Sequence, residues 1–313
     1  MMDGEAREGY LLFWRIIIPI TPNLFPKMRN RDRKVMGRSC LEYNQIDILN
    51  NMSDKRPIGV FDSGVGGLSV LKELHKLLPK EDFIFVADQA NVPYGEKSQS
   101  KLCQLTSNIS KFLIKNDVKL IVVACNTATC NSIDFLRKKF TVLFVGTVPA
   151  IKPAAEQTQN KCIGIISTPS TSESDYFSDL ITKHAQGVKV VNIGCAGLEN
   201  AVEKGDLKSK ETELLLKKYL APIKIAEADV IVLGCTHYPF LKTKIKSNLG
   251  PSVKIIDSGK AIAKRTLSLL ENSNSLNTQG GKSHYLTTGD GKIFSKVASV
   301  LMKKRISANH ITF

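Results

Sequence analysis

Two cysteines stand in matching sequence contexts that suit proton transfer. Cys125 follows the apolar run "LIVVA" and precedes Asn126-Thr127, and Cys235 follows "VIVLG" and precedes Thr236-His237. Unbroken apolar runs of this kind are typical of parallel strands covered on both faces, so each cysteine is expected where a buried strand ends. A thiolate can act as a base, and His237 is near enough in sequence to share the proton of Cys235.

Other polar residues follow other predicted strands. "GVFDSGVGG" places Asp62 and Ser63 at a strand end beside the start of a helix, where a carboxylate can hold an ammonium group or take part in proton transfer. The loop "NVPYGEKS" presents Tyr94 and the bare amide of Gly95; its structural alternative is a plain turn. The hydroxyls of "STPST" (167–171) suit helix N-caps or carboxylate binding.

The remaining cysteines are interpreted as packing residues, because free cysteine is among the most buried residue types. They are Cys103, Cys130, Cys162 and Cys195, while Cys40 lies in the N-terminal region. The total of 7 is odd and the sequence contains no C-x-x-C, which argues against a disulfide framework or a structural zinc site. We therefore expect a cytoplasmic protein without a bound metal.

The net positive charge suggests nucleic-acid binding, but the distribution of the basic residues argues against it. The formal net charge is +15, but most basic residues are spread singly, with tight clusters such as those at 29–34 and 303–305. No nucleic-acid-binding signature accompanies them, so we expect weak polyanion binding at most. The apolar run 10–20 is about half the length that spans a bilayer and contains Arg15, so no membrane association is expected.

Residues 1–51 carry no clear periodic pattern. We expect them to form a disordered N-terminal extension, with Met52 as the hypothetical true start. From Pro57 onward, apolar strand-like runs alternate with helical patterns. The predicted strands are 57–62, 83–88 and 120–125, and the predicted helices are 68–78 and 101–117.

The same plan then repeats along the chain. Strand-like runs occur at 162–168, 188–194 and 230–235, with a helical pattern at 211–226. This predicts an α/β fold of two related units, each an open parallel sheet. Residues 259–313 should add a helix, a strand and a helix that close one of the two sheets.

The strand ends should meet in one site. In open α/β sheets, ligands bind at the carboxyl ends of the strands. Cys125 and Cys235 both occupy such ends, so two facing domains would bring them to one site from opposite sides.

Five ordered motifs resemble the glutamate racemases of the aspartate/glutamate racemase family. They are "GVFDSGVGGLSVL", "ADQANVPYGEKS", "VVACNTAT", "STPSTSES" and "LGCTHYPFLK". The resemblance covers the chain from about Pro57 to its end. It implies an α/β fold of two pseudo-symmetric open parallel-sheet domains that face each other across an active-site cleft. Residues 57–148 plus 259–313 would form the first domain and 149–258 the second. The resemblance also implies cofactor-independent supply of D-glutamate for peptidoglycan. The N-terminal extension and Ser172-Glu173-Ser174, where relatives often place a basic residue, depart from the pattern.

The resemblance also implies roles for particular residues. Cys125 and Cys235 would stand on opposite faces of the substrate, with Cys235 deprotonating L-glutamate and Cys125 deprotonating D-glutamate. The binding positions would be Asp62, Ser63, Tyr94, Gly95, Asn126, Thr127, Thr236 and His237. His237 would assist Cys235, and Asp62 would assist Cys125 or hold the substrate ammonium. Two bases avoid moving one base across the substrate plane, and no cofactor is expected.

Alternatives to this interpretation stay open at the level of sequence. The same paired thiols could racemise aspartate or another acidic amino acid. A cysteine hydrolase or thiol redox enzyme does not explain the second matching strand end, and a polyanion-binding protein explains neither cysteine. "DSGVGG" is not G-x-G-x-x-G, because Ser69 takes the third glycine position, so a dinucleotide site has little support. A homodimer is compatible with the sequence but is not required by it.

Overall fold

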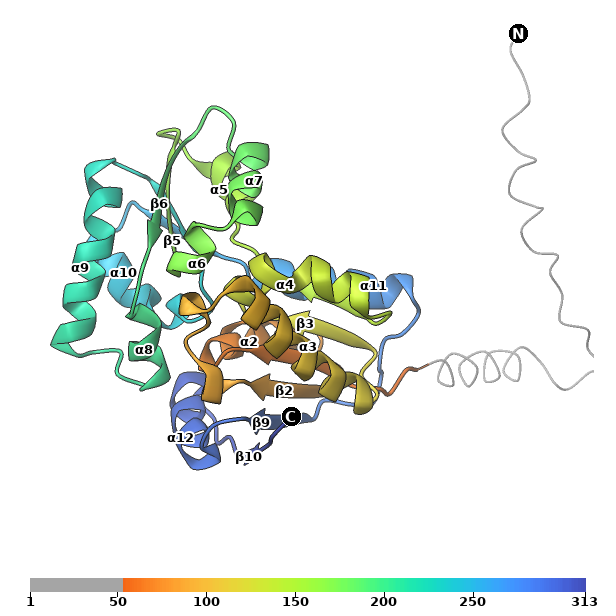
Figure 1. Cartoon of the computed structure of the whole chain (residues 1–313). Helices are drawn as coiled ribbons and strands as arrows, with labels where there is room; N and C mark the ends of the chain where they lie inside the picture. Colours follow the sequence, from red (N-terminus) through yellow and green to blue (C-terminus); the bar gives the residue numbers. More distant parts are fainter. Residues whose placement is uncertain (1–52) are drawn as a thin grey trace, which may run out of the picture. The chain divides into compact units, whose positions relative to one another are not determined.

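Two all-parallel sheets organise residues 53–313, the part of the chain that the computed structural model describes (Figure 1). The first sheet has the order β10-β9-β2-β1-β3-β4 and the second the order β6-β5-β7-β8. Their strands are β1 (Ile58–Asp62), β2 (Phe83–Ala87), β3 (Leu120–Val123), β4 (Leu143–Gly146), β5 (Cys162–Ser167), β6 (Lys189–Gly194), β7 (Val230–Leu233), β8 (Lys254–Asp257), β9 (Ser283–Thr287) and β10 (Ala308–His310). The predicted α/β fold class is confirmed.

Helices connect the strands, and we call each sheet with its helices a lobe. The first lobe contains α2 (Leu68–Leu77), α3 (Gln99–Lys115), α4 (Asn126–Lys139), α11 (Gly259–Asn272) and α12 (Gly291–Met302). The second contains α5 (Ile151–Gln157), α6 (Pro169–Ser172), α7 (Asp175–His184), α8 (Leu198–Glu203), α9 (Lys210–Ile225) and α10 (Lys242–Leu249). Short 3₁₀ turns are η2 (Val65–Gly67), η3 (Gln89–Asn91), η4 (Tyr94–Glu96) and η5 (Tyr238–Leu241).

The two sheets share one internal plan. β2-β1-β3-β4 of the first lobe corresponds to β6-β5-β7-β8 of the second. Within this plan β3 is equivalent to β7, and every residue of both strands is buried. Cys125 comes two residues after β3, and Cys235 comes two residues after β7. The predicted pseudo-symmetry, with equivalent positions for the two cysteines, is therefore confirmed.

The C-terminal segment completes the first sheet. β9 pairs with β2, and β10 pairs with β9, while α11 packs against α2. The predicted helix, strand and helix are present, and β10 is an additional strand that the sequence pattern did not indicate. The domain boundaries at 148 and 259 stay a prediction. The expected extension 1–51, with Cys40 and the proposed start at Met52, lies outside the described residues.

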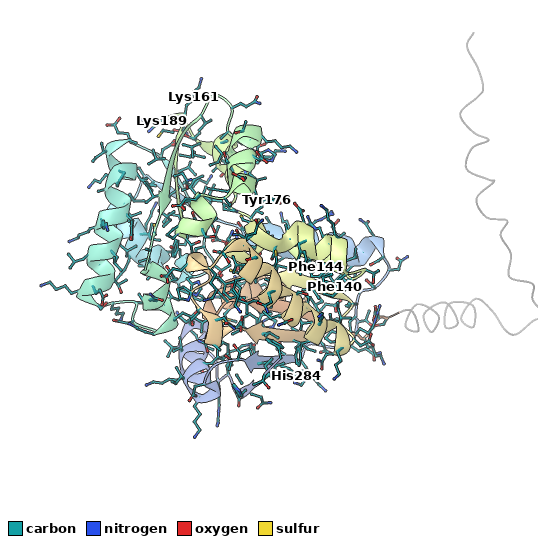
Figure 2. The ribbon with its side chains drawn as sticks, in the orientation of Figure 1. Phe140, Phe144, Lys161, Tyr176, Lys189 and His284 are labelled. Atoms are coloured by element: carbon teal, nitrogen blue, oxygen red, sulfur yellow. The ribbon has the colours of Figure 1, made fainter. Side chains whose placement is uncertain are left out.

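Two basic residues lie side by side at one end of the second sheet, and the expectation that the positive charge is spread singly stays a prediction. Lys161 and Lys189 lie at the amino ends of β5 and β6, at the opposite end of these strands from the cysteine-bearing edge (Figure 2). Cys130, Cys162 and Cys195 are buried and Cys103 is half-buried, in keeping with their interpretation as packing residues. No helix within 53–313 has the length and apolar character that crossing a bilayer requires.

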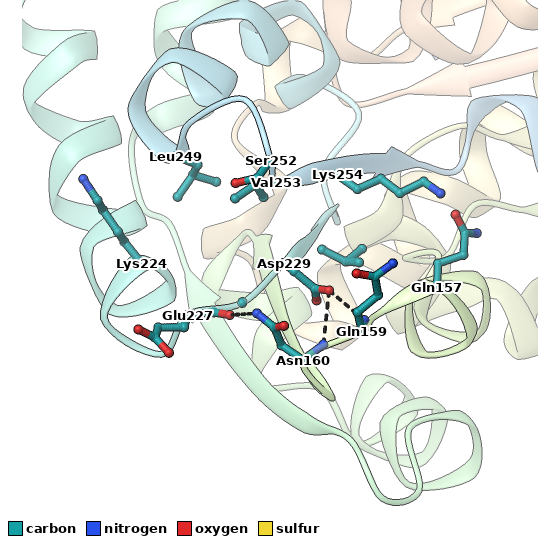
Figure 3. Close-up of a pocket in the computed structure, with 12 residues that line it drawn as sticks. Gln157, Gln159, Asn160, Lys224, Glu227, Asp229, Leu249, Ser252, Val253 and Lys254 are labelled. Atoms are coloured by element: carbon teal, nitrogen blue, oxygen red, sulfur yellow. Dashed lines mark hydrogen bonds between the residues drawn. The ribbon is translucent and has the colours of Figure 1, made fainter.

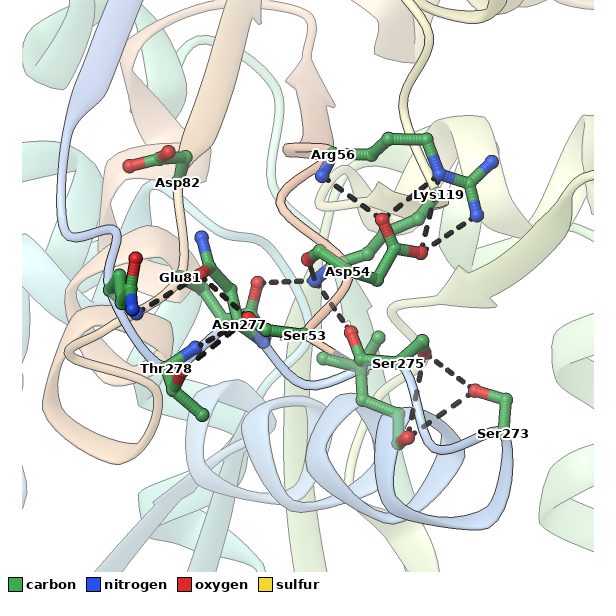
Figure 4. A network of polar contacts seen from close by, with 12 residues as sticks. Ser53, Asp54, Arg56, Glu81, Asp82, Lys119, Ser273, Ser275, Asn277 and Thr278 are labelled. Carbon is green, nitrogen blue, oxygen red and sulfur yellow. Dashed lines mark hydrogen bonds and ion pairs between the residues drawn. The ribbon is translucent and has the colours of Figure 1, made fainter. Parts of the chain in front are cut away.

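A buried ion pair fastens the amino end of the first sheet. Lys119 Nζ lies 2.7 Å from Glu81 Oε2, and both side chains are 1% exposed. Nζ also donates to the carbonyls of Asp54 and Ser275, at 2.8 and 2.7 Å, and the Asn277 amide donates to Glu81 Oε1 at 2.7 Å (Figure 4). Buried charges need such partners, so this network ties the start of the described chain to the segment before β9.

Candidate active site

A closed cavity lies between the carboxyl ends of the two sheets. Its lining comes from both lobes and consists of Ser63, Val92, Pro93, Tyr94, Gly95, Cys125, Asn126, Thr127, Thr168, Glu199, Cys235 and His237. The free volume for the centre of a water molecule is only about 10 Å³, which is room for about one water. A larger molecule would need the lining side chains or the lobes to move.

Most of the residues that the sequence singled out meet in this cavity. Eight of the ten predicted site residues appear in the lining, including both cysteines. Asp62 and Thr236 do not: Asp62 is fully buried beside the cavity, and Thr236 lines a small adjoining one. The missed lining residues are Val92, Pro93, Thr168 and Glu199, of which Thr168 belongs to the hydroxyl-rich segment noted above.

Cys125 is held at the N-terminus of α4. It is the N-cap of this helix, and its Sγ accepts from the Ala128 amide at 3.5 Å. Its thiol also reaches Ser63 Oγ at 3.8 Å. Burial raises the pKa of the Cys125 thiol, and the Asp62 charge adds to the rise, while the Ala128 and Ser63 contacts oppose it. The N-terminus of a helix favours negative charge. The amino end of α4 therefore stabilises a Cys125 thiolate without supplying a charged side chain.

Asp62 lies behind Cys125 and joins the two lobes. Its Oδ1 accepts from the Gly64 amide at 2.8 Å and from Ser63 Oγ at 3.2 Å, and its Oδ2 accepts from Thr236 Oγ1 of the second lobe at 2.9 Å. Burial raises the pKa of Asp62, and the His237 charge works against that rise. Asp62 is therefore linked to Cys125 by way of the Ser63 hydroxyl. Both oxygens of the Asp62 carboxylate already accept hydrogen bonds.

Cys235 is the first of three ionisable groups in contact, followed by His237 and Glu203. Its Sγ lies 3.5 Å from His237 Nδ1, and His237 Nε2 lies 2.6 Å from Glu203 Oε1. Burial disfavours a charged imidazole, but the Cys235 and Glu203 charges outweigh it and hold the pKa of His237 well above its usual value. Burial raises the pKa of Cys235, and His237 opposes the rise. A protonated His237 can therefore stabilise a Cys235 thiolate.

Glu203 is the member of the series Cys235, His237 and Glu203 that the sequence analysis missed. Besides His237 it accepts from the Val65 amide and from Gln89 Nε2, both at 2.7 Å and both in the first lobe. Burial opposes its charge, yet its donors keep the pKa of Glu203 below the usual value. Glu203 ends the six-residue helix α8, which is too short to leave a periodic pattern in the sequence.

The glycines of "DSGVGG" allow this contact between lobes. A Cβ at Gly64 would overlap the Glu203 carboxylate, and one at Gly66 would overlap the His237 ring. The sequence interpretation was a tight turn into a helix. The structure adds that a side chain at either position would push α8 or His237 of the second lobe away.

Hydroxyls line the other side of the cavity. Thr127 Oγ1 lies 2.8 Å from Thr168 Oγ1 and 3.1 Å from Thr171 Oγ1, so a cluster of three threonines spans both lobes. Tyr94 donates to Asp88 at 2.6 Å, which orients the loop that carries Gly95. These donors sit beside the thiols and can contact the oxygens of a carboxylate.

Three larger hollows elsewhere on the described chain are lined by neither Cys125 nor Cys235. One of about 550 Å³ lies at the amino ends of β7 and β8 (Figure 3). Of its two carboxylates, Glu227 and Asp229, the latter already accepts hydrogen bonds from the Thr158 hydroxyl and from the Gln159 and Asn160 amides. Residues 53–313 contain no cluster of three or more His, Cys, Asp or Glu side chains that could hold a metal. The closed cavity with its paired thiols is the candidate site.

Comparison with known proteins places the chain in a family. A family model described as Asp/Glu/hydantoin racemase matches residues 58–266. The chain belongs to this racemase family. A curated glutamate racemase of Herpetosiphon aurantiacus is 46% identical over 248 residues, covering 79% of this chain and 98% of that protein. Membership makes this racemase an isomerase.

Solved structures of relatives have the same fold. A glutamate racemase isoform of Bacillus anthracis matches with a TM-score of 0.76 and 30% identity, over 83% of this chain and 98% of that one. The glutamate racemase of Francisella tularensis, solved in complex with D-glutamate, matches with a TM-score of 0.72 and 30% identity, again over 83% and 98%. The resemblance identified from the motifs is confirmed at the level of family and fold.

Proposed function

We propose that this racemase interconverts L- and D-glutamate, with Cys125 and Cys235 as its two acid–base groups and no cofactor. The observation that carries the proposal is the position of the two thiols. They end equivalent strands of facing sheets and line one small cavity. Inversion at a carbon needs a proton removed from one face and delivered to the other, and two facing thiols provide both.

Each proton transfer conserves atoms and charge. A thiolate at Cys235 takes the α-proton of L-glutamate, so that the Cα–H bond breaks and an S–H bond forms. The thiol of Cys125 then gives its proton to the opposite face and is left as the thiolate, which starts the reverse reaction on D-glutamate. Burial keeps both ligand-free thiols protonated, so the first step requires that Cys235 lose its proton, which a charged His237 favours.

Neutral donors suit the carboxylates of the substrate. Asn126, Thr127 and Thr168 line the cavity, and donors fixed in a buried site stabilise negative charge that develops on a substrate. Ser63, Tyr94 and the Gly95 amide would provide further contacts from the first lobe. Thr236 donates a hydrogen bond to Asp62 and so holds that carboxylate in place. Support for glutamate itself comes from the curated relatives and from the Francisella structure, which are described as glutamate racemases.

The cellular role follows from the proposed product. D-glutamate would serve peptidoglycan synthesis, and the cytoplasm would be the site of the reaction. The described cysteines are all free thiols, which suits a reducing compartment.

Incubation with each enantiomer in heavy water tests the proposal. L- or D-glutamate should acquire deuterium at Cα and lose optical purity without an added cofactor. Exchange with aspartate but not with glutamate would move the substrate assignment to the alternative acidic amino acid. A protein that exchanges no amino acid would contradict the racemase mechanism.

A further inference from the structure

Each oxygen of the Glu203 carboxylate has its own partners. Oε1 accepts from His237 Nε2 at 2.6 Å and from the Val65 amide at 2.7 Å. Oε2 accepts from Gln89 Nε2 at 2.7 Å, the one hydrogen bond that the described chain gives this oxygen. A carboxylate held at both oxygens is restrained from turning about its Cγ–Cδ bond. Gln89 therefore helps to fix the direction in which Oε1 meets His237.

Gln89 is in turn held by the C-terminal part of the first sheet. β2 and β9 are parallel neighbours that end together, with Ala87 paired to Thr287, so the residues after β2 lie beside the end of β9. Thr287 Oγ1 donates to Gln89 Oε1 at 3.1 Å and accepts from the Gly289 amide at 3.0 Å. A Cβ at Gly289 would approach Gln89 Cβ to 2.9 Å, so a glycine at this position leaves room for the glutamine.

The orientation of the Gln89 amide follows from the partners at its two ends. An ionised carboxylate accepts hydrogen bonds and cannot donate them, so the end of the amide that meets Glu203 is its NH2 group. The Thr287 hydroxyl has a single proton, and since its oxygen accepts from Gly289, that proton is available to Gln89 Oε1. Thr287 is fully buried, so bulk water does not compete for its hydroxyl. Both ends therefore select the same orientation of the amide.

These contacts form one continuous series from the C-terminal segment to a thiol of the other lobe. The members are Thr287, Gln89, Glu203, His237 and Cys235, with successive separations of 3.1, 2.7, 2.6 and 3.5 Å. Burial opposes the charge of Glu203, and donated hydrogen bonds, that of Gln89 among them, keep the pKa of this carboxyl below its usual value. Neither Gln89 nor Thr287 lines the cavity, so any effect of theirs on the reaction has to pass through Glu203.

We propose that Gln89 and Thr287 are positioning residues for proton transfer at Cys235. They hold the Glu203 carboxylate, which in turn holds the imidazole of His237. The inference rests on the proposed function, because it extends the series of groups that assists this thiol. The amide of Gln89 is neutral, so it orients the carboxylate without cancelling its charge. The last residue of β9 thus contributes to proton transfer in the opposite lobe.

Proton NMR tests the positioning without any substrate. The proton between His237 Nε2 and Glu203 Oε1 belongs to a short, charge-assisted hydrogen bond, and such protons resonate far downfield. Isotope-labelled histidine in the full-length protein, compared with the variant His237→Gln, assigns this resonance among the 5 histidines. In Gln89→Leu the resonance should move upfield or broaden, because leucine has a similar size but no donor for Oε2.

Kinetics then test whether this arrangement serves Cys235. Gln89→Leu should lower kcat for L-glutamate by about fivefold, the equivalent of one neutral hydrogen bond. KM should change by less than about twofold, because the residue lies outside the cavity. The primary isotope effect should increase for L-glutamate and decrease for D-glutamate, as expected for a change confined to the step at Cys235. Thr287→Val should give the same pattern with a loss of about twofold in kcat.

Two further variants separate positioning from a general loss of structure. Thr287→Ser keeps the hydroxyl and should retain the wild-type kcat and the wild-type His237 resonance. Gln104→Leu removes an exposed amide on α3, whose oxygen accepts from Lys101 at 3.2 Å, and it should change neither quantity. Circular dichroism of each variant checks that it is folded.

The possible outcomes also distinguish this inference from the proposed reaction. An unchanged His237 resonance in Gln89→Leu would overturn the positioning role. An isotope effect that increases for both enantiomers, or a loss in Thr287→Ser as large as in Thr287→Val, would overturn it as well. If the wild type exchanges no deuterium but its His237 resonance still depends on Gln89, the hold on His237 stands and only the proposed reaction fails.

Discussion

Cys125 and Cys235 end equivalent strands of equivalent sheets, but the groups around them differ in kind. Cys125 caps a 14-residue helix and contacts a serine hydroxyl, so its aids are neutral. Cys235 contacts an imidazole that is itself paired with a buried carboxylate, so its aid is a full charge. The nearest charge to act on Cys125 is that of Asp62, which makes its thiolate harder to form.

The difference teaches how an internally repeated fold can serve a reaction with two unlike faces. The strand order fixes where each thiol stands, because both follow the same central strand of the same plan. The assisting groups come from the loops and short helices after the strands, where the two lobes have diverged. The rate of proton transfer at Cys235 should therefore depend on the charge of its neighbours and on pH. The rate of proton transfer at Cys125 should depend on local hydrogen bonds.

Replacing either thiol should produce the largest effect. Cys125→Ser and Cys235→Ser each remove one acid–base group, and positioned proton transfer contributes about 10²- to 10⁴-fold. Racemisation, followed by circular dichroism of the substrate, should fall by that factor in both variants. Cys103→Ser, which lies outside the cavity, is the matched control. A normal rate in either active-site variant would contradict the two-base mechanism.

His237→Gln should be the next largest change and should affect one side only. Loss of the charged helper of Cys235 is expected to lower the rate by about 10²-fold. With α-deuterated substrates, the step at Cys235 should become more rate-limiting. The primary isotope effect should therefore increase for L-glutamate, whose α-deuteron Cys235 removes, and decrease for D-glutamate, whose α-deuteron Cys125 removes. An equal increase for both enantiomers would show that His237 serves the two thiols alike.

Glu203→Gln should make the charged form of His237 less stable and change how the free energy of unfolding varies with pH. The raised pKa of His237 gives stability that is present below its unfolded pKa of about 6.5 and is lost as pH rises through the folded value. The lowered pKa of Glu203 gives stability present above its unfolded pKa and lost as pH falls through the folded value. Wild type should exceed the variant by about 1–3 kcal/mol between these limits, and activity should fall about tenfold.

Chemical denaturation across a series of pH values measures this difference in unfolding free energy. The gap between wild type and variant should narrow at both acidic and alkaline pH, because each extreme discharges one member of the pair. A gap that is constant over the whole range would mean that Glu203 contributes packing and neutral hydrogen bonds only.

Ser63→Ala should give the smallest effect, on the Cys125 side. The variant removes the hydroxyl 3.8 Å from the thiol, a neutral contact worth about 0.5–1.5 kcal/mol. The rate should fall by less than about tenfold, and the isotope effect should now increase for D-glutamate. A loss as large as that of His237→Gln would remove the proposed distinction between a neutral and a charged side.

The sequence was sufficient for the plan of the fold but not for its less buried strands. Unbroken apolar runs predicted β1, β3, β5 and β7, and helical periodicity predicted α2, α3 and α9. β4, β8 and β10 were missed. β4 and β8 have four residues each, as β3 and β7 do, but β3 and β7 are buried throughout whereas β4 and β8 begin with an exposed residue and are only partly buried. β10, "ANH", has three residues and carries no alternation.

The site was predictable where it follows strands and not where it depends on packing between lobes. Cys125, Asn126 and His237 come directly after recognisable strands. Glu199 and Glu203 lie on α8, in "LENAVE", where carboxylates are ordinary surface residues by pattern. The approach of α8 to Gly64 brings the Glu203 carboxylate against the other lobe, and no local pattern reports that approach.

The first sheet is assembled from chain segments that leave the ribosome at very different times. The strands of the second sheet form one uninterrupted stretch from β5 to β8, whereas the first sheet receives β9 and β10 only after that stretch is complete. Because domains fold as they emerge, N-terminal parts first, a nascent chain that ends before β9 would contain both cysteines but an unfinished wall on one side. Translation of the last strands therefore completes the sheet whose central strand precedes Cys125.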